Sequence, residues 1–144
     1  MPRGADEDGA DVDDANIKIY MRVRPTKKPS GYFELNESNG RVSFEVPKEM
    51  VNNMVNNSRT NWDFRYDGII GMDSTQEEVF EKVAAPVNES ALAGFNATIF
   101  AYGQTGSGKT FTITGGVERY VDRGIIPRTL SWFFNKFQEN SDTS

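Results

Sequence analysis

Residues 96–116 read NATIFAYGQTGSGKTFTITGG, an apolar run that passes directly into a cluster of small residues and one lysine. Within this stretch, residues 103–110 (GQTGSGKT) match the spacing G-x-x-x-x-G-K-[ST]. Glycines let the backbone curl so that successive N–H groups face phosphate oxygens, with no Cβ to block the approach. The spacing therefore predicts a P-loop, a site for a nucleoside triphosphate.

The remaining positions of the motif supply charge and metal chemistry. A helix that begins near Gly108 would direct its positive end at the same anion. Lys109 adds a mobile positive charge for the β- and γ-phosphates, and Thr110 offers a hydroxyl to Mg²⁺, which prefers oxygen ligands. A flexible turn with an exposed lysine is the alternative, but the motif follows a predicted strand and precedes a helix-compatible run. The predicted phosphate and Mg²⁺ site comprises Gly103, Gln104, Thr105, Gly106, Ser107, Gly108, Lys109 and Thr110.

Four segments have the pattern of strands. Residues 16–25 alternate apolar and polar side chains, which predicts a strand that ends at Pro25. Residues 31–46 predict a β-hairpin that turns at Asn39 and Gly40, and residues 62–70 alternate again. The run ATIFAY, residues 97–102, is continuously apolar, as in a strand buried on both faces of a parallel sheet.

Two segments have the pattern of helices. After Asp73, Ser74 and Glu77 stand at the spacing of a capping box, and Gly94 is expected to end the helix that follows. Pro86 is expected to kink or split this helix. Pro127 marks the start of a second helix. The expected apolar face of the first helix holds Val79, Phe80, Val83, Ala84, Val87 and Ala91, and that of the second holds Leu130, Phe133, Phe134 and Phe137.

Charge is distributed unevenly over the 144 residues, whose net charge is −5 at pH 7. Residues 1–15 hold six acids and one arginine, whereas the other 129 residues carry 15 acids and 15 bases. The first fifteen residues are therefore expected to form a disordered acidic tail. Cysteine and histidine are absent, which excludes disulfides, thiol chemistry and an imidazole base. No apolar run approaches the roughly 20 residues of a membrane span, so we expect a soluble, cytosolic chain with no membrane partner.

The sequence resembles kinesin motor domains along residues 16–140. ATIFAYGQTGSGKTFT resembles the kinesin signature, and IKIYMRVRP (17–25) resembles the first motor strand with its Arg-x-Arg-Pro end. Residues 62–70, 74–110 and 123–130 are similar to the segments that surround the P-loop in that family. The Asn-rich loop and residues 112–128 are most similar to the kinesin-9 family of ciliary and flagellar kinesins.

This resemblance implies an α/β P-loop NTPase fold, with a central sheet flanked by helices that is incomplete in this chain. It implies ATP and Mg²⁺ as cofactors, and an adenine framed by Arg22, Arg24, Pro25 and Phe111, although the arginines could be ordinary surface residues and the phenylalanine a core residue. It also implies microtubules as the partner. The implied location is the cytoplasm and the cytoskeleton, which includes the axoneme of cilia or flagella. No nucleic-acid partner is expected, and any dimer is expected to form through regions beyond this chain.

Parts of the kinesin pattern do not occur in these residues. The segments N-x-x-S-S-R-S-H and D-x-x-G-S-E, which act on the γ-phosphate in kinesins, are absent. Residues 16–140 are therefore expected to be the N-terminal part of a motor domain, with 141–144 a truncated end. Such a chain would bind ATP without hydrolysing it. It would also be unstable alone, because a strand beside residues 97–102 would be missing.

Two other interpretations remain open. The chain could be a non-catalytic nucleotide-binding or regulatory module that docks on a partner through its unpaired strand. It could also be an unrelated P-loop enzyme such as a small-molecule kinase, although the similarity outside the P-loop favours a kinesin.

Overall fold

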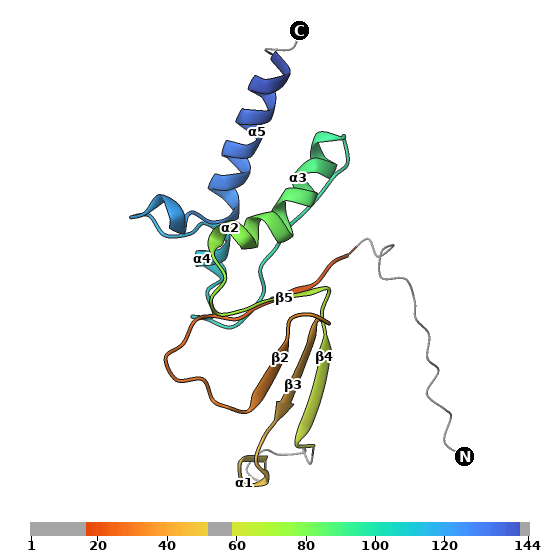
Figure 1. Ribbon diagram of the computed structural model, residues 1–144, viewed down its shortest axis with the longest axis vertical. Coiled ribbons are helices and arrows are strands. Elements are labelled where there is room, and N and C mark those ends of the chain that lie inside the picture. Colours follow the sequence, from red (N-terminus) through yellow and green to blue (C-terminus); the bar gives the residue numbers. More distant parts are fainter. Residues whose placement is uncertain (1–16, 52–58, 142–144) are drawn as a thin grey trace, which may run out of the picture. The chain divides into compact units, whose positions relative to one another are not determined.

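The computed structural model describes residues 17–51 and 59–141, which fall into two compact units (Figure 1). One unit contains residues 17–21 and Ser30–Ile69, and the other contains Arg22–Pro29 and residues 70–141. The expected acidic tail and residues 52–58 of the Asn-rich loop lie outside the described residues.

A three-stranded antiparallel sheet forms the first unit. Its strands β2 (Phe33–Asn36), β3 (Arg41–Glu45) and β4 (Asn61–Arg65) follow one another in chain order, and the short helix α1 (Lys48–Val51) comes after β3. Val42 on β3 is fully buried between its partners Leu35 and Phe64. The predicted hairpin over residues 31–46 is confirmed.

The turn of this hairpin requires a glycine. Gly40 has a φ of 67°, in the left-handed region, and a Cβ at this position would collide with the carbonyl of Tyr66. The Tyr66 N–H in turn donates to the Gly40 carbonyl at 2.8 Å. A side chain at position 40 would therefore disturb both the turn and the residue that follows β4.

We expect Gly40→Ala to lower the free energy of unfolding of this unit by about 2 kcal/mol or more, since left-handed strain adds to the collision. Gly31→Ala is the matched control, because Gly31 also has a positive φ, 75°, but open space around it. It should cost only about 1 kcal/mol. Urea unfolding followed by Trp62 fluorescence, in a Trp132→Phe background, measures both. Equal losses would show that the collision with Tyr66 is relieved at no cost.

Strands β1 (Tyr20–Arg22) and β5 (Gly68–Ile70) form a separate two-stranded sheet. In the first unit the Asp67 N–H donates to the Ile19 carbonyl at 2.9 Å, and in the second the Val23 N–H donates to the Ile70 carbonyl at 2.9 Å. The strand predicted over residues 62–70 is therefore two strands in different sheets. It divides because the N–H groups of Tyr66 and Asp67 bind different neighbours, the hairpin turn and the segment before β1.

The first predicted helix spans three consecutive elements of the second unit: α2 (Gln76–Val79), the π-helical turn η2 (Phe80–Ala84) and α3 (Ala85–Leu92). Pro86 stands at the start of α3, and the Ala85 N–H reaches back five residues to the Phe80 carbonyl. The predicted split at Pro86 is confirmed. The helix ends before Gly94, whose φ is 95°, as predicted.

The capping box lies one residue later than the sequence pattern suggested. The Thr75 N–H donates to Glu78 Oε2 at 2.6 Å, and the Glu78 N–H donates to Thr75 Oγ1 at 3.2 Å. Ser74 does not cap this helix, because its N–H donates to the Gly71 carbonyl in a preceding turn. The prediction of Ser74 and Glu77 was therefore wrong, and Gln76 becomes the first helical residue.

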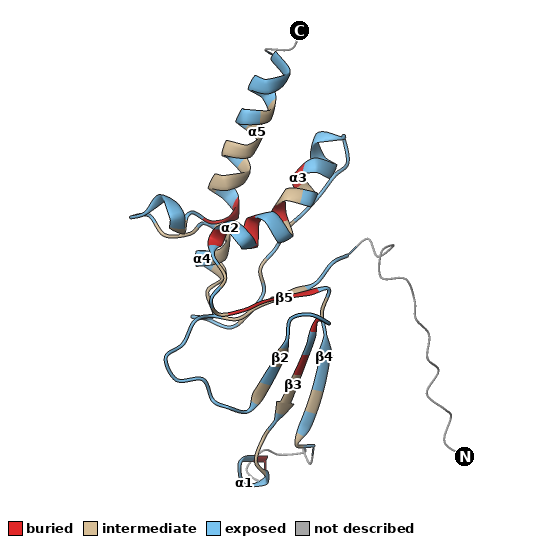
Figure 2. Cartoon of the chain, in the orientation of Figure 1, coloured by how far each residue is buried: buried red, intermediate tan, exposed pale blue. Residues whose placement is uncertain are grey.

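The core of the second unit is small (Figure 2). Its buried apolar residues are Val79, Phe80 and Ala84, together with Ile70 of β5 and Ile125 of the long helix α5 (Ile125–Ser141), which packs against η2. The apolar face predicted for the first helix is narrower than expected, because Val83 and Val87 are half-buried and Ala91 is exposed. The start of α5 beside Pro127 is confirmed, and α5 reaches one residue into the expected end, 141–144. Its predicted stripe is not buried by the described residues: Phe134 is 66% exposed.

The strand predicted over residues 97–102 is absent. The segment has no regular structure, none of the described strands pairs with it, and the Phe100 and Tyr102 side chains are 81% and 96% exposed. Elsewhere the described residues form sheets and helices, which is consistent with part of the predicted α/β P-loop fold. Among the described helices, none is long and apolar enough to cross a membrane.

Candidate functional site

The P-loop motif leads into helix α4 (Lys109–Ile113), as the sequence predicts. Gly108 is the N-cap of α4 and has a φ of 102°, a conformation that residues with a Cβ rarely adopt. Before it, the Ser107 N–H donates to the Gln104 carbonyl at 3.2 Å and closes a tight turn. The first N–H groups of a helix have no partner within it, so those of α4 remain available for an anion.

The side chain of Lys109 folds back over this loop. Its Nζ donates to the carbonyls of Gly103 and Gln104, at 2.7 and 2.8 Å. The lysine charge is therefore held at the start of the motif, beside residues that precede Lys109 by five and six positions in the sequence. An ammonium group has three donors, and these carbonyls occupy two of them, so one N–H remains for a phosphate oxygen in this position.

Thr110 fits the predicted Mg²⁺ role only together with a nucleotide. The residue is exposed in the first turn of α4 and offers a single hydroxyl oxygen. The described part of the chain holds no group of three or more acidic, histidine or cysteine side chains that could bind a metal ion. Mg²⁺ is commonly bound by one or two protein oxygens, substrate phosphates and water, and Thr110 can supply such a protein oxygen.

Two of the four residues predicted to frame the adenine lie together. The Arg22 guanidinium lies 5.7 Å from the centre of the Phe111 ring, and Phe111 as a residue is 44% exposed. Arg24 donates instead to the Gly106 carbonyl of the P-loop, and Pro25 is exposed on the segment that follows. Partial burial lowers the pKa of Arg22 from its usual value, but arginine remains charged at neutral pH.

Sequence reasoning missed two residues that hold this arrangement. Gln76 is only 5% exposed, and it binds Arg22 as well as two backbone carbonyls. Thr112 accepts a hydrogen bond from Arg22 Nη1 at 2.9 Å. The only sequence signal for Gln76 is its place just after the Thr75 N-cap, which the shifted capping box concealed.

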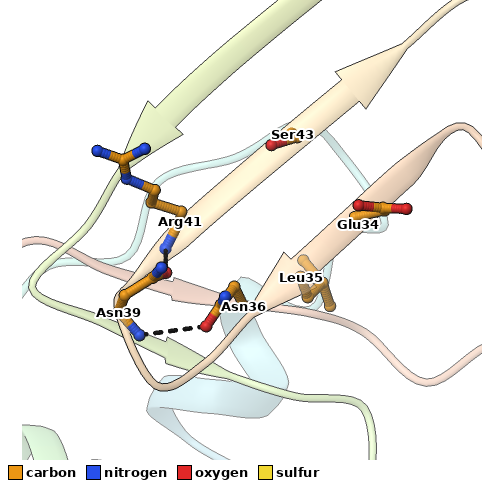
Figure 3. A pocket seen from close by; sticks show the side chains of 6 residues that line it. All are labelled: Glu34, Leu35, Asn36, Asn39, Arg41 and Ser43. Atoms are coloured by element: carbon orange, nitrogen blue, oxygen red, sulfur yellow. Dashed lines mark hydrogen bonds between the residues drawn. The ribbon is translucent and has the colours of Figure 1, made fainter.

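A hollow lies on the three-stranded sheet, away from the motif in sequence (Figure 3). It has a volume of about 440 Å³ and is lined by residues of β2, β3 and the turn between them. Asn39 and Asn36 are hydrogen-bonded at its rim through the Asn39 N–H, at 3.3 Å. The hollow is open and holds only one residue of each charge, Glu34 and Arg41, so the P-loop is the stronger candidate.

A P-loop that begins a helix, with a lysine over the loop and an arginine beside an exposed aromatic ring, has the features of a nucleotide-binding protein. Comparison with known proteins identifies the family. The Kinesin motor domain family matches residues 22–144, and the chain belongs to this family.

Curated relatives support the same family. The chain is 38% identical over 126 residues to "Kinesin-like protein KLP1" of Chlamydomonas reinhardtii, covering 88% of this chain and 16% of that protein. It is 39% identical over 124 residues to "Kinesin-like protein KIF9" of Mus musculus, and the match covers 85% of this chain and 16% of that protein. It is 39% identical over 126 residues to "Kinesin-like protein KIF15" of Mus musculus, and the match covers 83% of this chain and 9% of that protein. The predicted kinesin resemblance is confirmed, and the chain spans about a sixth or less of these relatives.

Proposed function

We propose that these residues are the ATP-binding part of a microtubule motor ATPase. The observation that carries the proposal is the position of Lys109, whose Nζ is held over the P-loop by the Gly103 and Gln104 carbonyls at the start of helix α4. Membership of the kinesin motor domain family supports ATP and Mg²⁺ as the ligands.

Each residue would have a defined task in binding. Residues 103–110 would bind the phosphates through the Lys109 ammonium and through backbone N–H groups other than that of Ser107, which is bound to the Gln104 carbonyl, and Thr110 would bind Mg²⁺ through its hydroxyl. Arg22, Arg24, Pro25 and Phe111 would frame the adenine, with the Phe111 ring stacked on the base. Bound Mg²⁺ would offset the charge of the phosphates.

We further propose that these 144 residues bind Mg-ATP but do not turn it over. Phosphoryl transfer depends on groups positioned around the γ-phosphate, and in kinesins those groups lie in segments that do not occur in this sequence. Movement along microtubules, location on the cytoskeleton including cilia or flagella, and any dimer would belong to a longer protein that contains these residues.

Isothermal titration of the chain with ATP tests the proposal directly. We expect binding of ATP in the presence of Mg²⁺ and weaker binding in excess EDTA. A separate assay of phosphate release should give no signal above background, with or without microtubules. Absence of ATP binding would overturn the proposal. Phosphate release that microtubules stimulate would show that these residues suffice for catalysis and would contradict its second part.

A second candidate function is favoured by the exposed apolar segment 97–102, which could dock a short regulatory module on a partner. Blotting cell extract and isolated cilia with an antibody to residues 41–65 distinguishes the two. A band several times larger than 16.1 kDa supports a motor, whereas a single band at that mass favours the module.

Replacing Phe111 tests the adenine site separately from the phosphate site. We expect Phe111→Ala to lower the affinity for ATP by on the order of tenfold, since stacking of a base on an aromatic ring contributes about 1–3 kcal/mol. The affinity for inorganic tripolyphosphate, which has no base, should change little. Competition against a fluorescent ATP analogue measures both. Phe137→Ala, at a similarly exposed position on α5, is the control. A parallel loss of both affinities would contradict a stacking role.

A further inference from the structure

Gln76 is buried, and both N–H donors and the oxygen of its amide are hydrogen-bonded. Its Oε1 accepts from Arg22 Nη1 at 2.8 Å, while its Nε2 donates to the carbonyls of Phe111 and Asp122, at 2.6 and 3.0 Å. These partners fix the orientation of the amide, because a guanidinium can only donate and a carbonyl can only accept. Flipping the amide would place donor against donor and acceptor against acceptor.

The hydrogen bonds continue from Arg22 into the P-loop. Arg22 Nη1 also donates to Thr112 Oγ1 at 2.9 Å, and that hydroxyl donates to the Gly108 carbonyl at 3.0 Å. Gly108 is the last glycine of the motif and the N-cap of α4. A continuous chain of hydrogen bonds thus runs from Gln76 through the Arg22 guanidinium to the residue where the P-loop becomes a helix.

The backbone of Gln76 is itself firmly placed. It is the first residue of α2, directly after the Thr75 N-cap, and the reciprocal capping box of Thr75 and Glu78 fixes this end of the helix. One side chain of defined position therefore fixes the Arg22 guanidinium and the backbone carbonyl of Phe111, the two residues whose cation and ring lie 5.7 Å apart.

We propose that Gln76 is a positioning residue for the nucleoside part of the ligand, acting through Arg22 and Phe111 without touching the nucleotide. This inference rests on the proposed function. Gln76 binds the Arg22 guanidinium and the Phe111 carbonyl directly, and it reaches the P-loop only through two further hydrogen bonds, so its contribution falls more on the base than on the phosphates.

The experiment compares the affinities of the chain for ATP and for inorganic tripolyphosphate. Gln76→Met removes every hydrogen bond of the amide at nearly constant volume, and we expect the ratio of the two affinities to fall by about five- to tenfold. Gln76→Glu keeps an oxygen for Arg22 but places its second oxygen against the carbonyls of Phe111 and Asp122, so it should restore only the part of the ratio that depends on Arg22. Gln138→Met, an exposed glutamine on α5, is the matched control and should leave the ratio unchanged.

A thermodynamic cycle tests whether Gln76 acts through Arg22. In an Arg22→Met background, Gln76→Met should lower the ATP affinity by less than it does in the unmodified chain, because only the part that acts through the Phe111 carbonyl remains. An undiminished effect in that background, or equal losses for ATP and tripolyphosphate, would indicate a general structural role and overturn the inference.

If circular dichroism shows that Gln76→Met does not fold, Gln76→Asn replaces it, since its amide is one methylene too short to reach Arg22. A wild-type chain that binds neither ligand would instead refute the proposed function.

Discussion

Replacing Lys109 by alanine is expected to lower the affinity for Mg-ATP by about 10- to 150-fold. Hydrogen bonds to a charged group contribute about 1.5–3 kcal/mol, and about 1.4 kcal/mol corresponds to tenfold in affinity. The structure holds the Lys109 Nζ over the loop by hydrogen bonds to the carbonyls of Gly103 and Gln104, which leave one of its three N–H donors for phosphate. Isothermal titration with ATP and Mg²⁺ measures the loss.

The matched control for this prediction is Lys136→Ala. Lys136 forms an exposed ion pair with Glu139 on the same helix, at 3.1 Å, and lies far along α5 from the motif in sequence. Its replacement should leave the ATP affinity unchanged. Circular dichroism before each titration verifies that both variants fold. If Lys109→Ala binds ATP as tightly as the unmodified chain, the P-loop lysine does not contact the phosphates and the site lies elsewhere.

Features that depend on neighbours in sequence were predicted well. The P-loop, the start of α4 beside Gly108, the turn at Gly40 and the interruption at Pro86 all follow from the conformational limits of single residues. The capping box is an instructive exception. Ser74 and Thr75 both stand three residues before a glutamate, so the pattern allows two solutions. Only the preceding turn, in which the Ser74 N–H is bound to Gly71, selects Thr75.

Features that depend on distant partners could not be predicted. The apolar run 97–102 has the composition of a buried strand, but a strand exists only where another strand binds its backbone, and no described strand does so. Hydrophobic pattern shows which surface a segment can bury, not whether a covering element lies within reach. Phe134 on α5 likewise belongs to a predicted apolar stripe, but it is exposed because no described element covers it.

In the candidate site, too, some residues are neighbours in sequence and others depend on distant partners. The residues proposed to bind phosphate are contiguous and match a motif, whereas Gln76 lies 35 residues from its partner Phe111 and 54 from Arg22. A glutamine in a helix is usually a surface residue, so composition gives no reason to select it. Its burial beside a charged arginine becomes visible only once α2 and α4 are placed within the second unit.

Phe80→Ala is expected to lower the free energy of unfolding of the second unit by about 3–5 kcal/mol, the range for large-to-small replacements in a core. Phe80 is 5% exposed in the π-helical turn η2, against which α5 packs, and the other buried apolar residues of this unit, such as Val79 and Ile125, are smaller. A cavity of this size cannot be filled by so few neighbours. Urea unfolding followed by far-ultraviolet circular dichroism, which reports mainly on this helical unit, measures the loss.

The same substitution at an exposed position separates burial from residue type. Phe134 on α5 is 66% exposed, so Phe134→Ala should change the free energy of unfolding by less than about 1 kcal/mol. Loss of the core would also weaken ATP binding, because α2, which carries Gln76, leads directly into the turn that holds Phe80. Phe80→Ala with no greater effect than Phe134→Ala would show that the second unit is not organised around Phe80, and the placement of Gln76 would lose its support.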